Sequence, residues 1–445
     1  MAKQHVVIDS EEIHATGEEA TYRLASDAVE LTGKPAWRLR QYEGRAQSLA
    51  VNRMAHEFHA IGDVEMKLPA GSIGRNGFLL PESSPATNAA PATAQPALVR
   101  ADDFQFRPDV ANTNFNVAVF RDHVQATSAK GSLSCELMTI QSTAQSNRTE
   151  SVVAERGVVM AQGERRVTGE KAVYTAAADT VEVTGHPAWK MGQHQGTAEV
   201  LAFNLKGDSY RATRRVEMRL PPASFGRTPW LLAKSGVLTN SSTGAGGATT
   251  PRPAQPIEIS CDEFELTPDA ANTNLNLAIY RGQVRVRDVD RMKLSCEFLA
   301  VRGRMLPGTN QVEKVVAEGN VDLEVHESRG ERRAQGDKAI YTAADGEVEL
   351  SGNGGVKIAF VDSKIEGSAM GAKAVYAGGQ DVLELTGNSV LGNPVLRTQD
   401  GQVWGEVLVL DHANTTLRAT GRWKMKLKPE SLKKTAAPAA PKPGS

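Results

Sequence analysis

The chain has 445 residues, of which 40% are hydrophobic and 23% are charged. This composition is ordinary for a folded protein of about three domains and excludes a wholly disordered chain. The 51 basic and 52 acidic residues give a net charge of −1, which excludes the overall basic character of a nucleic-acid-binding protein. No apolar run reaches the roughly 18 residues of a membrane-spanning helix, so the sequence predicts no transmembrane segment.

Internal repeats organise the sequence. A skeleton of Tyr, seven residues, Glu, Leu or Val, Thr or Ser, and Gly begins at Tyr22 and recurs at Tyr174, Tyr341 and Tyr376. We call the block around this skeleton a B block. Four copies of one supersecondary unit predict a repeat architecture.

A second type of block, the A block, carries Ala-Asn-Thr-Asn at 111–114 and again at 271–274. The order of blocks is B, A-B, A-B, so the first B block has no A block before it. We therefore expect the natural chain to extend upstream, with the missing A block and an export signal. Mass analysis of the native protein, which gives its true N-terminus, tests this expectation.

Composition shifts separate the blocks, because two stretches and the C-terminal end are rich in Pro, Ala, Gly, Ser and Thr. The predicted organisation is a B-type module at 1–80, a Pro/Ala-rich linker at 81–99, an A+B module at 100–236, a Gly/Ser/Thr/Pro-rich linker at 237–256, an A+B module at 257–432 and a disordered tail at 433–445.

The hydrophobic pattern within the blocks has a period of two. Val29 and Leu31 alternate with Glu30, and no long window shows the apolar stripe of an amphipathic helix. The pattern predicts an all-β fold of short, stacked antiparallel strands with very little helix. One apolar face requires a second sheet to cover it, as in a sandwich or jelly roll, and sheets that splay apart leave an apolar groove.

The B-block skeleton resembles the OstA-like family of lipopolysaccharide-transport proteins. The resemblance includes Val-Val-Ala-Glu-Gly-Asn-Val at 315–321 and Gly-Asp-Lys-Ala-Ile-Tyr at 336–341, and covers most of residues 1–430 outside the linkers. The family comprises the bridge protein LptA, LptC and the periplasmic domain of LptD.

The resemblance implies tandem β-jelly-roll or open β-taco modules that stack into a slide for lipid acyl chains. It implies a periplasmic location in a Gram-negative cell envelope, a role in outer-membrane assembly, and lipopolysaccharide or a similar glycolipid as the ligand. Sheet edges would pair with other envelope transport proteins by strand addition.

The alternating pattern nominates apolar residues of the B blocks as the lining of this groove. They are Val29, Leu31, Trp37, Leu39, Val181, Val183, Trp189, Met191, Leu350, Ile358, Leu385, Trp423 and Met425. An equally simple interpretation is that they fill a closed core, which makes the protein a structural β-repeat scaffold of the envelope that binds no lipid.

Cations follow three tryptophans, at Arg38, Lys190 and Lys424. Such cations suit the phosphates of a glycolipid at the rim of a groove. These cations alternate with the apolar residues along the strand. The favoured alternative is therefore that they lie on a solvated outer face or protect an edge strand.

No catalytic motif stands out. Glu30, Glu182, Glu349 and Glu384 recur at equivalent positions, and recurrence in every repeat favours a structural role over an active site, which is normally assembled once. The sequence therefore predicts no enzyme, and a polysaccharide-active enzyme ranks below both transport and scaffold.

Metal and cofactor sites are also not expected. His56 and His59 are the closest histidine pair, but a spacing of three on a strand turns them to opposite faces. The Gly-rich run at 243–247 lacks the Lys-Ser/Thr of a phosphate-binding loop. Of three cysteines, Cys261 and Cys296 share a module and are candidates for a disulfide, whereas buried free thiols are the simpler expectation.

Overall fold

The computed structural model describes residues 1–9, 13–39, 42–69, 96–192, 194–221, 255–288, 291–306, 309–327, 330–362, 366–412 and 414–428. Within these residues the chain is built from β-strands, and its one helical segment is the 3-10 turn η1 (Leu24–Ser26). The predicted all-β fold is confirmed.

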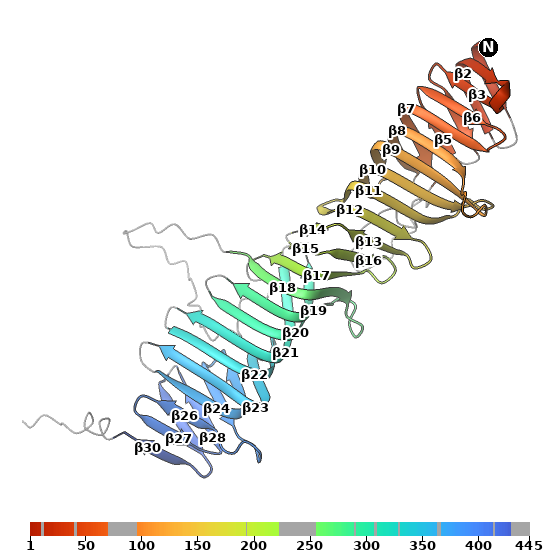
Figure 1. Cartoon of the computed structure of the whole chain (residues 1–445). Helices are drawn as coiled ribbons and strands as arrows, with labels where there is room; N and C mark the ends of the chain where they lie inside the picture. The colour runs from red at the N-terminus through yellow and green to blue at the C-terminus, as the bar shows by residue number, and fades with distance from the viewer. Residues whose placement is uncertain are drawn as a thin grey trace, which may run out of the picture. The chain divides into compact units, whose positions relative to one another are not determined.

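The chain forms two compact units (Figure 1). Unit 1 comprises Met1–Val216 and Glu265–Thr273, and unit 2 comprises Glu217–Phe264 and Asn274–Ser445. The division passes through two strands, β17 (Ser209–Leu220) and β18 (Ile257–Pro268).

The other strands follow in chain order. Unit 1 contains β1 (Ala2–Asp9), β2 (Ile13–Arg23), β3 (Ala28–Thr32), β4 (Ala36–Leu39), β5 (Tyr42–Arg45), β6 (Ser48–Asn52), β7 (Glu57–Leu68), β8 (Ala97–Pro108), β9 (Phe115–Thr127), β10 (Ser132–Thr143), β11 (Thr149–Gln162), β12 (Arg165–Thr175), β13 (Thr180–Thr184), β14 (Ala188–Met191), β15 (His194–Thr197) and β16 (Val200–Asn204). Unit 2 contains β19 (Asn276–Asp288), β20 (Met292–Leu306), β21 (Thr309–Glu327), β22 (Gly330–Thr342), β23 (Glu347–Asp362), β24 (Glu366–Ala377), β25 (Val382–Thr386), β26 (Val395–Thr398), β27 (Gly401–Trp404), β28 (Val407–Asp411), β29 (Thr416–Thr420) and β30 (Lys424–Leu427).

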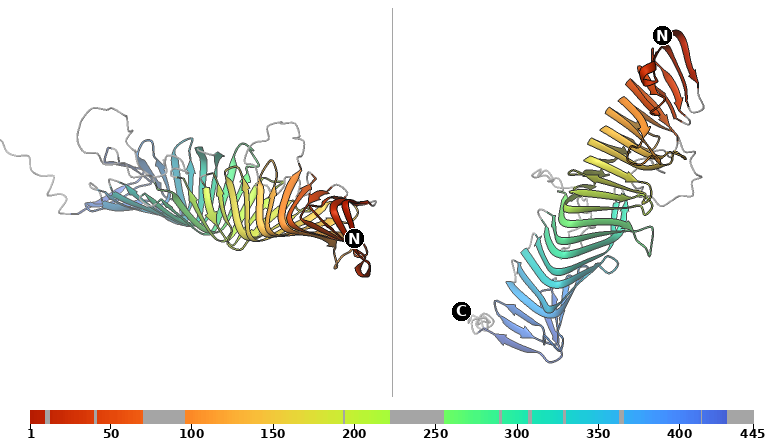
Figure 2. Two further views of the ribbon diagram at one scale, coloured as in Figure 1. Left: turned by 90° about the horizontal axis from the view of Figure 1, so that it is seen from above. Right: turned by 45° about the vertical axis from the view of Figure 1, so that its right-hand side comes forward.

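The long strands bend sharply near their middle. In β21 the register shifts between Glu318 and Val321, where Gly319 (φ 79°) and Asn320 (φ 50°) are both left-handed. Glycine and asparagine tolerate this conformation better than other residues, so the sequence sets the bend. Register shifts at comparable places in neighbouring strands align the bends and fold the sheet over on itself (Figure 2).

The bend divides the sheet of unit 2 into two walls. The first wall consists of 292–295, 321–327, 330–335, 356–362 and 366–371, with β26, β27 and β30 paired beyond it. The second wall consists of 298–306, 309–318, 338–342, 347–351 and 373–377, with β25, β28 and β29 beyond it.

The inner faces of the walls are apolar and the outer faces are polar, as the period of two predicts. In unit 1, Phe104 of β8 and Phe120 of β9 are buried, with ring centroids 4.8 Å apart. In unit 2, Phe264 and Tyr280 repeat this pair at 4.9 Å. Register shifts between Ile61 and Val64 and between Glu155 and Val158 mark the corresponding bends of unit 1, so each unit has two walls and its hydrophobic core lies between them.

One predicted linker overlaps the start of a strand. β8 begins at Ala97, inside the predicted linker at 81–99, and Ala97 pairs with Leu68 of β7. The rest of that linker up to residue 95, most of the 237–256 linker and the tail at 433–445 lie outside the described residues. The division into three modules stays a prediction about the repeats.

Candidate functional site: the apolar interior

Most predicted lining positions lie on the inner faces of the walls. Nine are buried and two are half-buried. The buried ones are Leu31, Trp37, Leu39, Val181, Val183, Trp189, Leu350, Ile358 and Leu385, and the half-buried ones are Val29 and Met191. Their inward orientation agrees with the pattern, whereas contact with a lipid stays a prediction.

Trp423 and Met425 do not join this interior. Trp423 is 61% exposed and Met425 is 47% exposed. Met425 pairs with Val403 of β27 on one side, and no strand of the described residues pairs with the other side of β30. Both residues are therefore exposed beside an edge strand, and their place in a lipid groove stays a prediction.

Glycines make room for the two buried tryptophans. Trp37 pairs with Gly44, and Trp189 pairs with Gly196. A Cβ atom on Gly44 or Gly196 would lie 2.3 Å or 2.2 Å from the indole ring, closer than packed atoms approach. Each indole thus lies flat over a glycine of the next strand, a contact that becomes evident only once the strand register is known.

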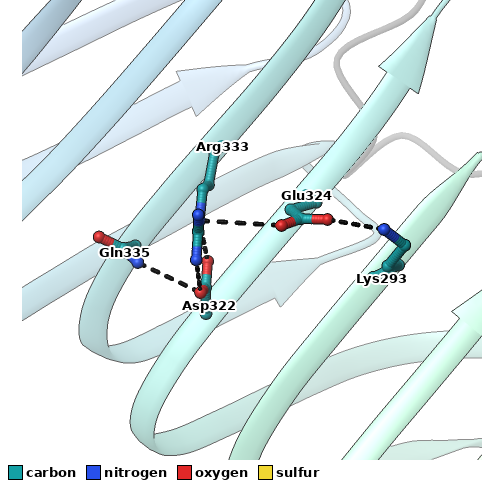
Figure 3. A network of polar contacts seen from close by, with 5 residues as sticks. All are labelled: Lys293, Asp322, Glu324, Arg333 and Gln335. Carbon is teal, nitrogen blue, oxygen red and sulfur yellow. Dashed lines mark hydrogen bonds and ion pairs between the residues drawn. The ribbon is translucent and has the colours of Figure 1, made fainter.

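The outer face is lined by ion pairs. On unit 2, the guanidinium of Arg333 binds the Asp322 carboxylate, and Lys293 Nζ lies 3.0 Å from Glu324 Oε2 (Figure 3). Gln335 donates a further hydrogen bond to Asp322. The bond from Arg333 is the main cause that holds the pKa of Asp322 below its usual value.

The glutamates that recur in the repeats also face solvent. Glu30 pairs with Arg23, and Glu349 pairs with Lys373, each at 2.8 Å. Glu182 and Glu384 are exposed. These positions fit the structural role predicted for them.

The cations after the tryptophans lie on the solvent side as well. Arg38 is 3.3 Å from Glu43, while Lys190 and Lys424 are exposed. In unit 1, Arg38 borders a hollow of about 670 Å³ on the outer face, where Arg45 lies 2.9 Å from Glu65. The charges of this hollow are largely neutralised by one another.

The interior of unit 2 contains an apolar cavity. Its volume is about 60 Å³, and Leu323, Val325 and Ile358 line it from the first wall. Leu350 and Leu383 line it from the second-wall side. The corresponding hollow in unit 1, between Leu39, Met66, Phe104, Phe120 and Ile140, has about 30 Å³. Ligand pockets typically have about 300–1,000 Å³, so both hollows are smaller than a typical ligand pocket.

Contacts between described residues cross the cavity of unit 2 from wall to wall, at the edge opposite the bend, which we call the mouth. Arg332 Nη1 of the first wall lies 3.8 Å from Asp381 Oδ1, in the turn after β24 of the second wall. The ring of Phe360 lies edge-on to the ring of His412, with centroids 5.9 Å apart. The sequence analysis did not identify Arg332 as a site residue. The alternating pattern nevertheless places its side chain on the opposite side of the strand from Glu331 and Arg333, which was a usable signal.

The repeated tyrosine has a structural task. Tyr22, Tyr174 and Tyr376 each donate a hydrogen bond to the aspartate five residues later, at 2.8, 3.2 and 2.9 Å. Those aspartates, Asp27, Asp179 and Asp381, are all left-handed, with φ from 44° to 56°. At the fourth copy, Tyr341, a glycine, Gly346, occupies the left-handed position instead. The tyrosine therefore stabilises the turn that ends its strand.

The cysteines and histidines show no reactive or metal-binding arrangement within the described residues. Cys135, Cys261 and Cys296 are buried free thiols, so the structure has no Cys261–Cys296 disulfide. Burial raises the pKa of Cys135 to about 11 and those of Cys261 and Cys296 to about 12. His59 Nε2 is 2.5 Å from Asp103 Oδ2 and does not join His56, and the described part of the chain contains no group of three metal-ligating side chains.

Comparisons with known proteins identify the family of the chain. Residues 99–208 and 259–370 match the family described as LptA/(LptD N-terminal domain) LPS transport protein. No curated protein sequence matches the chain. One matching solved structure is LptH from Pseudomonas aeruginosa, described as the LptA-homologous periplasmic component of the lipopolysaccharide transport device. It is 19% identical over 39% of this chain and 96% of its own, with a TM-score of 0.19.

No helix in the described ranges has the length and apolar character needed to cross a bilayer.

Each family match begins in the A block and extends into the following B block, so the repeats found in the sequence and the matched regions overlap. The chain belongs to the OstA-like family of LptA and the N-terminal domain of LptD, and it carries two matched copies of that domain.

Proposed function

We propose that the chain binds lipopolysaccharide or a similar glycolipid and carries it through the periplasm of a Gram-negative bacterium during outer-membrane assembly. The protein acts by binding and not as an enzyme. The observation that carries the proposal is the apolar inner face, enclosed between two walls, in a chain with two family matches.

The physical reason is the cost of exposing acyl chains to water. Burying each CH₂ group contributes about 0.8 kcal/mol, so a chain of ten groups gains roughly 8 kcal/mol. The predicted lining residues Leu31, Val183 and Leu350 offer this apolar surface. The sugar and phosphate groups would stay in water at the mouth, and the driving force for movement comes from elsewhere in the transport complex.

We further propose that free sheet edges recruit other envelope transport proteins by strand addition. β1 pairs only with β2 among the described strands, and β30 pairs only with β27. Such strands present unpaired backbone groups on one side.

A second function is favoured by one observation. The cavities of about 60 and 30 Å³ are smaller than an acyl chain needs, which suits a closed core. On this reading the protein is a structural scaffold of the envelope that engages other proteins and no lipid.

Photo-crosslinking separates the two functions. A photoreactive amino acid is placed singly at Leu31, Val183 or Leu350 and, as matched outer controls, at Glu30, Glu182 or Glu349. We expect the inner positions to capture lipopolysaccharide and the outer positions to stay unlabelled. Equal labelling of both sets, or no labelling of the inner set, supports the scaffold.

A further inference from the structure

The Arg332–Asp381 pair joins the two walls of unit 2 across the cavity mouth. Arg332 lies on the inner face of the first wall, between Val325 and Phe360 on the adjacent strands. Only 11% of its side chain is exposed, and Asp381 is 15% exposed. The pair is thus largely shielded from water.

The second-wall side of this contact is held firmly. Tyr376 donates a hydrogen bond to the Asp381 carboxylate at 2.9 Å, and the backbone N–H of His412 donates to the Asp381 carbonyl at 3.0 Å. Because His412 also meets Phe360 of the first wall, both crossing contacts involve the same turn. They form one tie, which we call the clasp: Arg332, Phe360, Tyr376, Asp381 and His412.

The narrow cavity makes opening necessary. A space of about 60 Å³ cannot hold an acyl chain, so the walls must separate before a chain can enter from the mouth. Separation pulls Arg332 away from the Asp381 carboxylate, beside an apolar cavity. Losing an anionic partner in a place shielded from water costs free energy, whereas exchanging one anionic partner for another costs much less.

An anionic group on the entering ligand avoids this cost, because it can take the place of Asp381 as a partner of Arg332. A guanidinium binds phosphate or carboxylate through paired hydrogen bonds, in a geometry that matches the fork of arginine. Arg332 lies where an amphiphile with its tail in the cavity would place its polar head, because the clasp is at the mouth.

We propose that the clasp is a headgroup site, in which a phosphate of the bound glycolipid replaces Asp381 on Arg332 as the walls separate. The inference rests on the proposed function and specifies how unit 2 admits its ligand. Asp381 holds Arg332 in the closed state, and the phosphate holds it in the open state.

The test uses the full-length protein with the photoreactive residue at Leu350, incubated with lipopolysaccharide or with the same material after removal of its lipid phosphates. Asp381→Asn keeps the turn, because asparagine tolerates the left-handed conformation and still accepts the bond from Tyr376. We expect this variant to increase capture about fivefold or more, with the preference for phosphorylated lipid retained.

Arg332→Met removes the cation and keeps an apolar side chain of similar length. We expect it to capture phosphorylated and dephosphorylated lipid equally. Lys293→Met and Glu324→Gln, which break an ion pair on the outer face of the same wall (Figure 3), are the matched controls and should leave capture unchanged. Circular dichroism verifies that each variant is folded.

The outcomes separate the two proposals. Unchanged capture in Asp381→Asn, or a phosphate preference that survives Arg332→Met, overturns the headgroup site while the proposed function stands. Absence of capture at both Leu350 and Val183 in the unsubstituted background overturns the proposed function and this inference with it.

Discussion

On β22, two arginines that are neighbours in sequence lie in opposite environments. The side chain of Arg333 is 48% exposed and belongs to a network of ion pairs, whereas that of Arg332 is 11% exposed and reaches across the cavity to the other wall. The same contrast holds along the strands of both units, where apolar inner residues alternate with paired charges outside. Burial of the inner face stabilises the fold and provides the surface for any ligand, whereas the charged outer face is solvated.

The largest effect on stability is expected at the inner face. Phe104→Ala removes a ring that is 1% exposed and packed on Phe120, so it should lower the free energy of unfolding by about 3–5 kcal/mol. Glu182→Ala on the outer face should change it by less than about 0.5 kcal/mol. Urea denaturation of both variants checks the difference, and similar losses would contradict the assignment of the faces.

Two methionines at inner-face positions differ in whether a neighbouring strand covers them, and this difference should affect stability. Met66 of β7 is covered by β8, through its pairing with Val99, while Met425 of β30 has no described strand beyond it. Met66→Ala should cost about 2–5 kcal/mol, and Met425→Ala less than about 1 kcal/mol. An equal cost, measured by urea denaturation, would mean that Met425 is buried in solution.

The tryptophan–glycine contacts predict an intermediate effect. Gly196→Ala inserts a methyl group into the ring of Trp189 and should destabilise the protein by about 1–3 kcal/mol. Gly207→Ala is the control, because a Cβ atom there would lie 3.3 Å or more from its nearest neighbours, which are side-chain atoms of Asn204 and Ser209. Tryptophan fluorescence should change for the first variant only; unchanged fluorescence and stability in both would refute the contact.

The smallest effect belongs to the outer ion pairs. Asp322→Asn should cost less than about 1 kcal/mol at neutral pH, because exposed pairs are screened by water. The pKa of Asp322 is lowered in the folded protein, so its contribution is present above the unfolded pKa of about 4 and is lost as the pH falls through the folded value. Urea denaturation should show a larger difference between variant and parent at pH 7 than near pH 3, and a difference that grows in acid would contradict this account.

The strand pattern and the faces were predictable from the sequence, because a period of two gathers Leu31 and Val183 with other apolar residues on one face of each strand, and burial of that face turns it inward. Turns were partly predictable: the tyrosine skeleton was visible, but its bond to Asp27 or Asp381 requires the left-handed turn that only the fold reveals.

What the sequence could not supply depended on contacts between distant strands. Trp423 is exposed just before β30, which pairs only with β27 among the described strands, and its own sequence does not show this. The clasp joins Arg332 to Asp381, 49 residues later, and no local pattern encodes a contact across two walls. Likewise, the strand that begins at Ala97 is anchored by its pairing with Leu68 and not by the Pro/Ala-rich residues before it.

Native mass spectrometry with acylated and chemically deacylated lipopolysaccharide tests the central claim most directly. If hydrocarbon tails occupy the space between the walls, the protein should form complexes with the acylated form alone, and Leu350→Asp should weaken them while Glu349→Asp does not. Equal binding of the deacylated sugar would show that the interior does not hold the lipid and would contradict the account.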